Sequence, residues 1–309
     1  AGDEHYGPVD GLGEYAARFR ERYAFRRLPC RTVEGFCMVF TRRLAERIGL
    51  FDDGLPTPAL ADEDFCIRAR LEGYRNFIAG DVFVHRFRDP LDQGAKKALE
   101  KKWTLSTATP EGKRLVVVKA MDLADELCHQ GKTDQAIEEL IESIKVSPGD
   151  HAIYFEMARI LMESKRFPEA WEAFSAMPDG ARDEVRGLEY AGYIKEGLGL
   201  DQEASLCADK ILSIDPGYPA ALNLKGVLAY KQGEKETARH YFLKALENDR
   251  GCGEAYTNLG VLHWSMGNHQ EAISHLRKGF VLSPSVPDAA SLYHSMVSAL
   301  GALDAAEAD

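Results

Sequence analysis

An alanine recurs at intervals of 34 residues through the C-terminal two-thirds of the chain. It stands at five positions in one register: Ala136, Ala170, Ala204, Ala238 and Ala272. A strict period of this length is typical of an array in which one supersecondary unit is repeated and stacked. The period therefore restricts this part of the chain to a repeat architecture. The composition, 45% hydrophobic and 28% charged, supplies the apolar residues that stacking would bury.

Three further columns keep the same period and define the unit. Twelve positions before each alanine stands a small residue: Ala124, Ala158, Gly192, Gly226 and Gly260. Five positions before it stand Gly131, Lys165, Gly199, Gly233 and Gly267, and twelve after it, in three units, Pro148, Pro216 and Pro284. Between these columns apolar residues recur at helical spacing, which predicts two amphipathic helices per unit. We expect them to cross at the small residue, with the glycine ending the first helix and the proline ending the second.

These columns resemble the tetratricopeptide repeat (TPR), a helical hairpin of 34 residues. The resemblance implies a mostly α fold, a TPR helical-hairpin solenoid. Its five repeats fall at residues 117–150, 151–184, 185–218, 219–252 and 253–286, and a capping helix and tail follow at 287–309. The second repeat departs most from the pattern, because Met177 and Pro178 interrupt its second helix.

In the TPR family the first helix of each unit lines an inner groove, which implies a protein or glycan acceptor as the partner of this array. Carried over, the groove positions include Tyr193, Asn223, Tyr230, Thr257 and Trp264. The aromatic members would offer the flat, amphipathic contact area of binding hot spots. The alternative is that they pack between adjacent helices, and both readings stay open. The Lys and Asn set with which some relatives grip a chaperone's C-terminal carboxylate is not present at these positions.

The first 90 residues have a different texture, and they predict a small α/β segment. "EGFCMVF" (34–40) and "GDVFVHRF" (80–87) are typical of strands. "TRRLAERIG" predicts a helix capped by Thr41 and ended by Gly49, and "DEDFCIRARLEG" a second helix ended by Gly73. A helical linker over 91–116 would join this segment to the repeats, with Trp103 facing inward and its lysines, Lys102 among them, facing solvent.

The order of these pieces over residues 33–88 resembles the C-terminal part of a family-two glycosyltransferase domain of the GT-A fold. The resemblance implies that Asp64 is the base that removes a proton from the acceptor hydroxyl, with Glu63 beside it. It also implies that His85 helps to hold a divalent metal, Mn or Mg, which neutralises the leaving diphosphate of a nucleotide sugar.

Plainer interpretations exist for the same residues. Three carboxylates at a helix N-terminus are favoured by the helix dipole, and Asp64 lies four residues before Arg68, the spacing of an ordinary helical ion pair. His85 on its own could be a hydrogen-bonded histidine. The nucleotide-binding half of the family's domain, with its Asp-x-Asp motif, has no counterpart here. We therefore expect a fragment that is inactive alone, or alternatively a TPR interaction scaffold with a degenerate glycosyltransferase remnant.

Charge and cysteine usage restrict the partners and the compartment. Residues 1–110 hold 18 Lys and Arg against 17 Asp and Glu, so the remainder of the chain holds 20 against 32 of the totals of 38 and 49. This acidic excess argues against nucleic acid as a partner. The cysteines show no metal-ligand spacing, and no apolar run reaches the length of a transmembrane segment. We expect a cytoplasmic protein with reduced cysteines.

Overall fold

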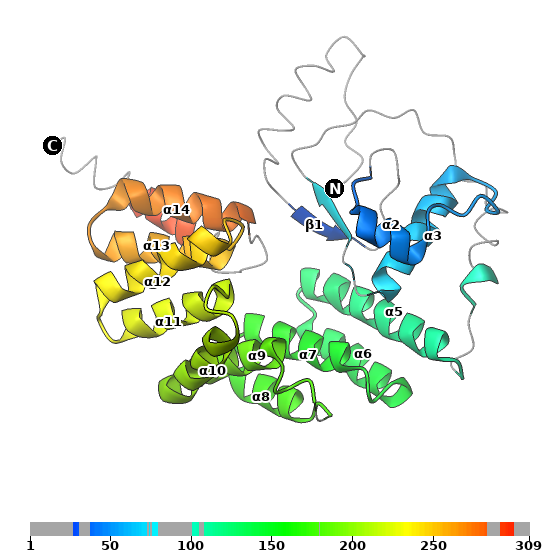
Figure 1. The fold of residues 1–309 in the computed structure, drawn as a ribbon, viewed down its shortest axis with the longest axis horizontal. Coiled ribbons are helices and arrows are strands. Elements are labelled where there is room, and N and C mark those ends of the chain that lie inside the picture. Colours follow the sequence, from blue (N-terminus) through cyan, green and yellow to red (C-terminus); the bar gives the residue numbers. More distant parts are fainter. Residues whose placement is uncertain are drawn as a thin grey trace, which may run out of the picture. The chain divides into compact units, whose positions relative to one another are not determined.

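The protein is described here by a computed structural model that covers residues 27–30, 38–72, 74, 76–79, 101–104, 108–178, 180–282 and 291–299 (Figure 1). Its contacts divide the chain into two units, residues 1–148 and 149–309, and each is described by itself. In the described part of the chain, no helix combines the length and the apolar character needed to cross a membrane.

The described part of residues 27–79 forms a two-stranded antiparallel ribbon and two helices. Strand β1 (Arg27–Cys30) pairs with β2 (Asn76–Ala79), and helices α2 (Arg42–Ile48) and α3 (Pro58–Leu71) lie between them in the sequence. Neither strand was predicted from the sequence. Residues 38–40, the described end of the expected strand 34–40, are not in a strand, and the expected strand 80–87 lies outside the described residues and stays a prediction. A four-residue strand forms only where a partner strand is available, and the partner of β1 lies more than 40 residues later in the sequence, where local patterns do not reveal it.

Helix α2 begins and ends as its capping residues predict. The Thr41 side chain accepts a hydrogen bond from the backbone N–H of Leu44, and the N–H of Gly49, at a φ of 77°, donates to the carbonyl of Ala45. The N-cap and the left-handed glycine satisfy backbone groups that the helix itself leaves open.

Helix α3 begins earlier than predicted, and this corrects the interpretation of its acidic residues. Thr57 is the N-cap and Pro58 the first helical residue, so Asp62, Glu63 and Asp64 lie one turn inside the helix and its first turn holds no acidic residue. Stabilisation by the helix dipole fades within the first turn, so it does not account for these carboxylates.

The first helical hairpin belongs to the N-terminal unit. Its helices are α5 (Pro110–His129) and α6 (Thr133–Val146), which pack against each other. Helix α5 starts seven residues before the predicted first repeat, with Thr109 as its N-cap. The end of the predicted linker is therefore continuous with the first helix of the array.

The second unit consists of four further hairpins, α7/α8, α9/α10, α11/α12 and α13/α14, in sequence order (Figure 1). Their helices are α7 (His151–Glu163), α8 (Phe167–Ser175), α9 (Val185–Gly197), α10 (Asp201–Ile214), α11 (Pro219–Lys231), α12 (Lys235–Asn248), α13 (Gly253–Ser265) and α14 (His269–Leu282). Residues 291–299, in the predicted capping segment, are also helical.

The periodic columns are the core of these hairpins. All five alanines of the 34-residue register are 0% exposed. The small residues twelve positions earlier are buried as well. At Gly260 an added Cβ would stand 2.6 Å from Cγ of Leu276, so two helices meet there with no room for a side chain. The repeat pattern read from the sequence is therefore a packing pattern.

The turn column, the position five residues before each alanine that forms the turn between the two helices, is a glycine in four repeats and a lysine in one. Its four glycines adopt φ values between 74° and 81°, the left-handed region that glycine enters without a steric penalty. Lys165 adopts φ 58° at the same position, the one non-glycine residue with positive φ in the described chain. The repeat geometry thus imposes the left-handed turn even where the sequence lacks glycine.

The second repeat is irregular where predicted. Helix α8 has nine residues, against 14 in α6, α10, α12 and α14. It ends at Ser175, and Met177 fills the core directly after it at 1% exposure. An apolar loop residue thus takes the place of the missing helical turns.

Candidate functional sites

A hydrogen-bonded ladder crosses the first helices of three successive hairpins. The hydroxyl of Tyr193 on α9 donates to the carbonyl of Ala220 at 2.9 Å and accepts from Nδ2 of Asn223 on α11 at 3.0 Å. Oδ1 of Asn223 accepts from Nδ2 of Asn258 on α13, also at 3.0 Å. Helix α11 contacts both α9 and α13, so the ladder fixes three neighbouring helices in one arrangement.

The ladder places two predicted groove residues in packing roles. Asn223 is 1% exposed and both ends of its amide have protein partners. Burial of Tyr193 raises the pKa of its phenol, which keeps it protonated as a donor. The sequence left open whether these residues bind a partner or pack between adjacent helices. In the structure Tyr193 and Asn223 pack between adjacent helices.

The other three groove positions differ in exposure. Thr257 is buried, and its hydroxyl donates to the carbonyl of Gly253 one turn earlier. Tyr230 is half-buried against the core formed by α11, α12 and α13. Trp264 is half-buried, and its ring lies 4.4 Å from that of His269. Tyr230 and Trp264 therefore keep part of their surface available.

Acidic side chains border the ladder. Oε2 of Glu189 on α9 accepts from the hydroxyl of Tyr218 at 2.7 Å. Burial raises the pKa of Glu189, an effect opposed by the Tyr218 hydrogen bond and the Arg186 charge and reinforced by the negative charge of Glu254 on α13. Glu254 itself is exposed. Glu189 on α9 and Glu254 on α13 are thus close enough for their negative charges to interact, beside the positive charge of Arg186 on α9.

The predicted base of the N-terminal unit lies at the centre of a second network. Asp64 is 0% exposed. Its Oδ2 accepts from Nε of Arg68 at 2.8 Å, which confirms the helical ion pair. Its Oδ1 accepts from Nε1 of Trp103 at 3.0 Å and from Nζ of Lys102 at 2.7 Å. Both carboxylate oxygens are thus covered by protein donors.

Lys102 does not simply face solvent, as predicted for the lysines of the linker. Its ammonium also pairs with Oδ2 of Asp52 at 2.6 Å. Although burial lowers the pKa of Lys102, hydrogen bonds to Asp52 and Asp64 outweigh that effect and raise it. The same hydrogen bond from Lys102 lowers the pKa of Asp52. Trp103 does face inward, as predicted, against Leu60.

The described residues do not fit the divalent metal that the resemblance implies. No group of three His, Cys, Asp or Glu side chains in the described ranges could hold an ion. The oxygens of Asp64 accept from N–H donors, and Glu63 is half-buried on the same helix. His85 lies outside the described residues, so its role stays a prediction.

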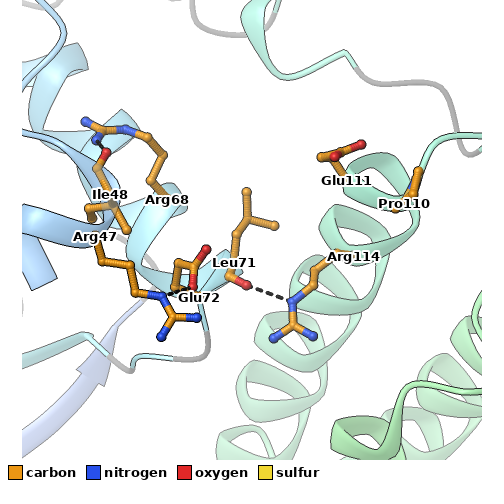
Figure 2. Close-up of a pocket in the computed structure, with 8 residues that line it drawn as sticks. All are labelled: Arg47, Ile48, Arg68, Leu71, Glu72, Pro110, Glu111 and Arg114. Carbon is orange, nitrogen blue, oxygen red and sulfur yellow. Dashed lines mark hydrogen bonds and ion pairs between the residues drawn. The ribbon is translucent and has the colours of Figure 1, made fainter.

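A pocket of about 370 Å³ lies beside this network (Figure 2). It is lined by Arg47, Ile48, Arg68, Leu71, Glu72, Pro110, Glu111 and Arg114. The three guanidinium groups have partners: Arg47 pairs with Glu72, Arg114 donates to the carbonyl of Leu71, and Arg68 donates to Asp64. With its positive groups already engaged, the pocket is a polar joint between α2, α3 and α5.

Sequence reasoning missed several members of both networks. Asn258 stands one position after the groove column, so no carried-over position pointed to it. Tyr218 precedes α11 and lies outside the first helix altogether. The pairing of Lys102 with Asp64 spans 38 residues of sequence and leaves no periodic signal. The start of α3, by contrast, could have been predicted, because a threonine followed by a proline is a typical sequence at a helix N-terminus.

Comparison with known proteins agrees with the repeat architecture. Two family models described as tetratricopeptide repeat match residues 127–189 and 209–287. The chain is 31% identical over 122 residues to the human cell division cycle protein 16 homolog, which covers 36% of this chain and 18% of that protein. It is 23% identical over 162 residues to the human protein O-mannosyl-transferase TMTC3, covering 48% of this chain and 17% of that protein.

A solved thermophilic TPR protein from Thermus thermophilus is 20% identical, with a TM-score of 0.47, over 58% of this chain and 97% of that one. The alignments to the curated relatives named above each span less than a fifth of the relative's length. The matched ranges contain four of the five alanines of the buried column and four of the five left-handed turn residues, while Gly199 and Ala204 lie between them. The chain therefore carries tetratricopeptide repeats.

Proposed function

We propose that the chain is a TPR scaffold that binds a positively charged segment of a protein partner on the face formed by α9, α11 and α13. The observation that carries the proposal is the ladder from Tyr193 through Asn223 to Asn258. It ties the first helices of three hairpins together, so that the side chains around it are presented on one pre-organised surface.

Charge supports the nature of the partner. Glu189 and Glu254 border the ladder from α9 and α13. Burial is the main cause of the raised pKa of Glu189; repulsion by Glu254 adds to it, while Tyr218 and Arg186 act against it. A Lys or Arg side chain placed near both would relieve that repulsion. Residues 111–309 hold 32 Asp and Glu against 20 Lys and Arg, and this net negative charge also attracts a basic segment.

Binding of labelled peptides, followed by fluorescence anisotropy, tests this proposal. The probes are basic, neutral and acidic 15-residue peptides of otherwise matched composition. Basic peptides should bind most tightly, and Glu254→Gln should weaken them about 2- to 5-fold, the range of a partly exposed ion pair. The matched control is Glu247→Gln, an exposed carboxylate on α12. Equal binding of acidic peptides would overturn the proposal.

A second candidate function concerns the N-terminal unit: a remnant or part of an inverting glycosyltransferase domain. It is supported by the order strand, helix, helix, strand around Asp64 and by the name of one relative, an O-mannosyl-transferase. On this proposal Asp64 accepts the proton of an acceptor hydroxyl, Glu63 lies beside it, and a nucleotide sugar is the donor. A divalent metal would depend on His85 and on residues beyond those described.

The test is nucleotide-sugar hydrolysis or transfer by the longest natural form of the protein, with and without Asp64→Asn. Loss of turnover in a variant that stays folded would support the enzyme. Turnover that is the same in Asp64→Asn would rule out Asp64 as the base, and absence of turnover in the unchanged protein would leave the TPR scaffold as the function. Asp53→Asn, an exposed carboxylate in the loop before α3, is the matched control.

A further inference from the structure

We propose that residues 101–104 form a strap that covers Asp64, and that this carboxylate can meet a ligand only after the strap has moved away. The proposal deepens the second candidate function. It is tested by the accessibility of one carboxylate, without any donor or acceptor, so its outcome is separate from that of sugar transfer.

The two oxygens of Asp64 are held in different ways. Oδ2 accepts from Arg68 on the same helix. The guanidinium of Arg68 also donates through Nη2 to the carbonyl of Leu50 at 2.7 Å and through Nη1 to that of Gly49 at 3.3 Å. This side is therefore tied to the end of α2 and forms part of the fixed framework.

Oδ1 is held from the strap. Its two donors, Nζ of Lys102 and Nε1 of Trp103, are neighbours in sequence and come from the segment before α5. Movement of this short segment would uncover Oδ1 while Oδ2 kept its bond to Arg68. The carboxylate would then present one acceptor atom to a ligand from a rigid helix.

Among the described residues, Lys102 and Trp103 attach the strap through one apolar contact and several polar ones. Trp103 and Leu55 pack against Leu60, the small apolar anchor of this region. The Lys102 side chain is 35% exposed, and its ammonium is shared between Asp64 and Asp52. The pair with Asp52 is partly exposed on both sides, and such pairs are worth little and are weakened by salt. The pair with the buried Asp64 is stronger, so the strap can open only when a ligand or water supplies donors to Oδ1 in its place.

The chemistry of Oδ1 restricts what could replace the strap. It accepts two hydrogen bonds, one of them from a cation, so a competing ligand must bring an N–H or O–H donor. A phosphate or carboxylate would meet the negative charge of Asp64 and Asp52 and is disfavoured. The ligand class is a hydroxyl or amine compound, and a sugar or side-chain hydroxyl meets this requirement.

Carboxyl labelling with a water-soluble carbodiimide and glycine ethyl ester, read by tandem mass spectrometry, tests the strap. Asp53, which is exposed, is the internal standard in every sample. In the unchanged chain Asp64 should label at least about tenfold more slowly than Asp53. In Lys102→Ala/Trp103→Ala it should gain about tenfold or more, with Asp53 unchanged. Lys101→Ala, an exposed neighbour, is the matched control and should leave the rate at Asp64 unchanged.

Three outcomes would overturn the proposal. The first is labelling of Asp64 at the rate of Asp53 in the unchanged chain. The second is no gain at Asp64 in the double variant. The third is an equal gain at Asp62, Glu63 and Asp64, which would mean that α3 itself unfolds. Lys102→Met, which keeps the side-chain stem but removes the charge, provides a milder second variant and should give a smaller, still selective gain at Asp64.

Discussion

A Cβ atom on Gly226 would stand 2.4 Å from Cε1 of Phe242, closer than real side chains approach. Phe242 is 1% exposed in the core of the α11/α12 hairpin and cannot swing away without leaving a void. The small-residue column is thus a requirement of the aromatic ring that faces it across the hairpin.

Gly226→Ala should therefore destabilise the protein although alanine is the better helix former. Overpacking costs about 1–3 kcal/mol, and the gain in helix propensity returns at most about 1 kcal/mol. A lowered urea midpoint checks this result. Gly149→Ala is the control, because no atom lies within 4 Å of an added Cβ there. A Gly226→Ala midpoint at or above the original would contradict the close packing.

Lys165→Gly should stabilise the second repeat. The left-handed conformation costs a non-glycine residue about 1–2 kcal/mol, and the added flexibility of glycine in the unfolded chain returns about 0.5–1 kcal/mol of that. We expect a net gain of up to about 1 kcal/mol, measured by thermal and urea unfolding. The reverse change, Gly233→Lys, enters open space at φ 81° and should destabilise by a similar amount. Two changes of the same sign would refute the backbone explanation.

Tyr193→Phe should cost about 1–3 kcal/mol, because it leaves the Ala220 carbonyl and the Asn223 amide without the shared hydroxyl. Urea denaturation measures the loss, and hydrogen exchange should show faster opening in α9 and α11. Tyr241→Phe, at a half-buried position on α12, serves as the comparison and should change the midpoint little. Equal effects from both substitutions would mean that the ladder adds no stability.

The last hairpin should lose stability as the solution becomes acidic. The rings of His263 on α13 and His275 on α14 stack at 5.2 Å. Burial, with the charges of His263 and Lys278, lowers the pKa of His275 below 6.5, against the weaker opposing effect of Glu271. The unfolded chain then binds more protons, so stability falls as the pH drops through about 6.5 and levels off below the native pKa.

Melting temperatures at pH 8 and pH 5.5 check this expectation. His275→Gln should reduce the difference between the two, whereas His240→Gln, at an exposed site on α12, should leave it intact. If both variants keep the full difference, the pH dependence arises elsewhere in the chain.

The repeat architecture could be predicted because each periodic column has a single physical cause. The small-residue column marks a close contact between helices, and every member of the alanine column is fully buried. The turn column marks the left-handed residue, and even Lys165 obeys it. The early end of α8 followed from Met177 and Pro178. Each of these features depends on neighbours within one unit, which a sequence displays directly.

The networks could not be predicted in the same way, because their members come from different elements. The register of the ladder depends on how Asn258 of α13 reaches Asn223 of α11. The groove positions taken from the TPR family indicate which face of a helix a side chain lies on. They do not indicate whether that side chain is hydrogen-bonded to a neighbouring helix. At Asp64 the local pair with Arg68 was legible from its spacing, whereas the contacts with Lys102 and Trp103 depend on the path of the intervening chain.

The short α8 has a consequence for how this chain tolerates changes in length. Helix α7, the nine residues of α8 and the loop after Ser175 together fill the same 34 positions as a complete repeat, so α9 resumes with Gly192 in register and α10 with Ala204. A residue added within α10 would rotate everything after it by about 100° around the helix and expose the buried column. A residue added next to the exposed Asp183, after the buried Met177 and Ala181, would instead lengthen the loop before α9. The second repeat is thus the place where evolution or engineering can change the spacing of the array without reorienting the helices beyond it.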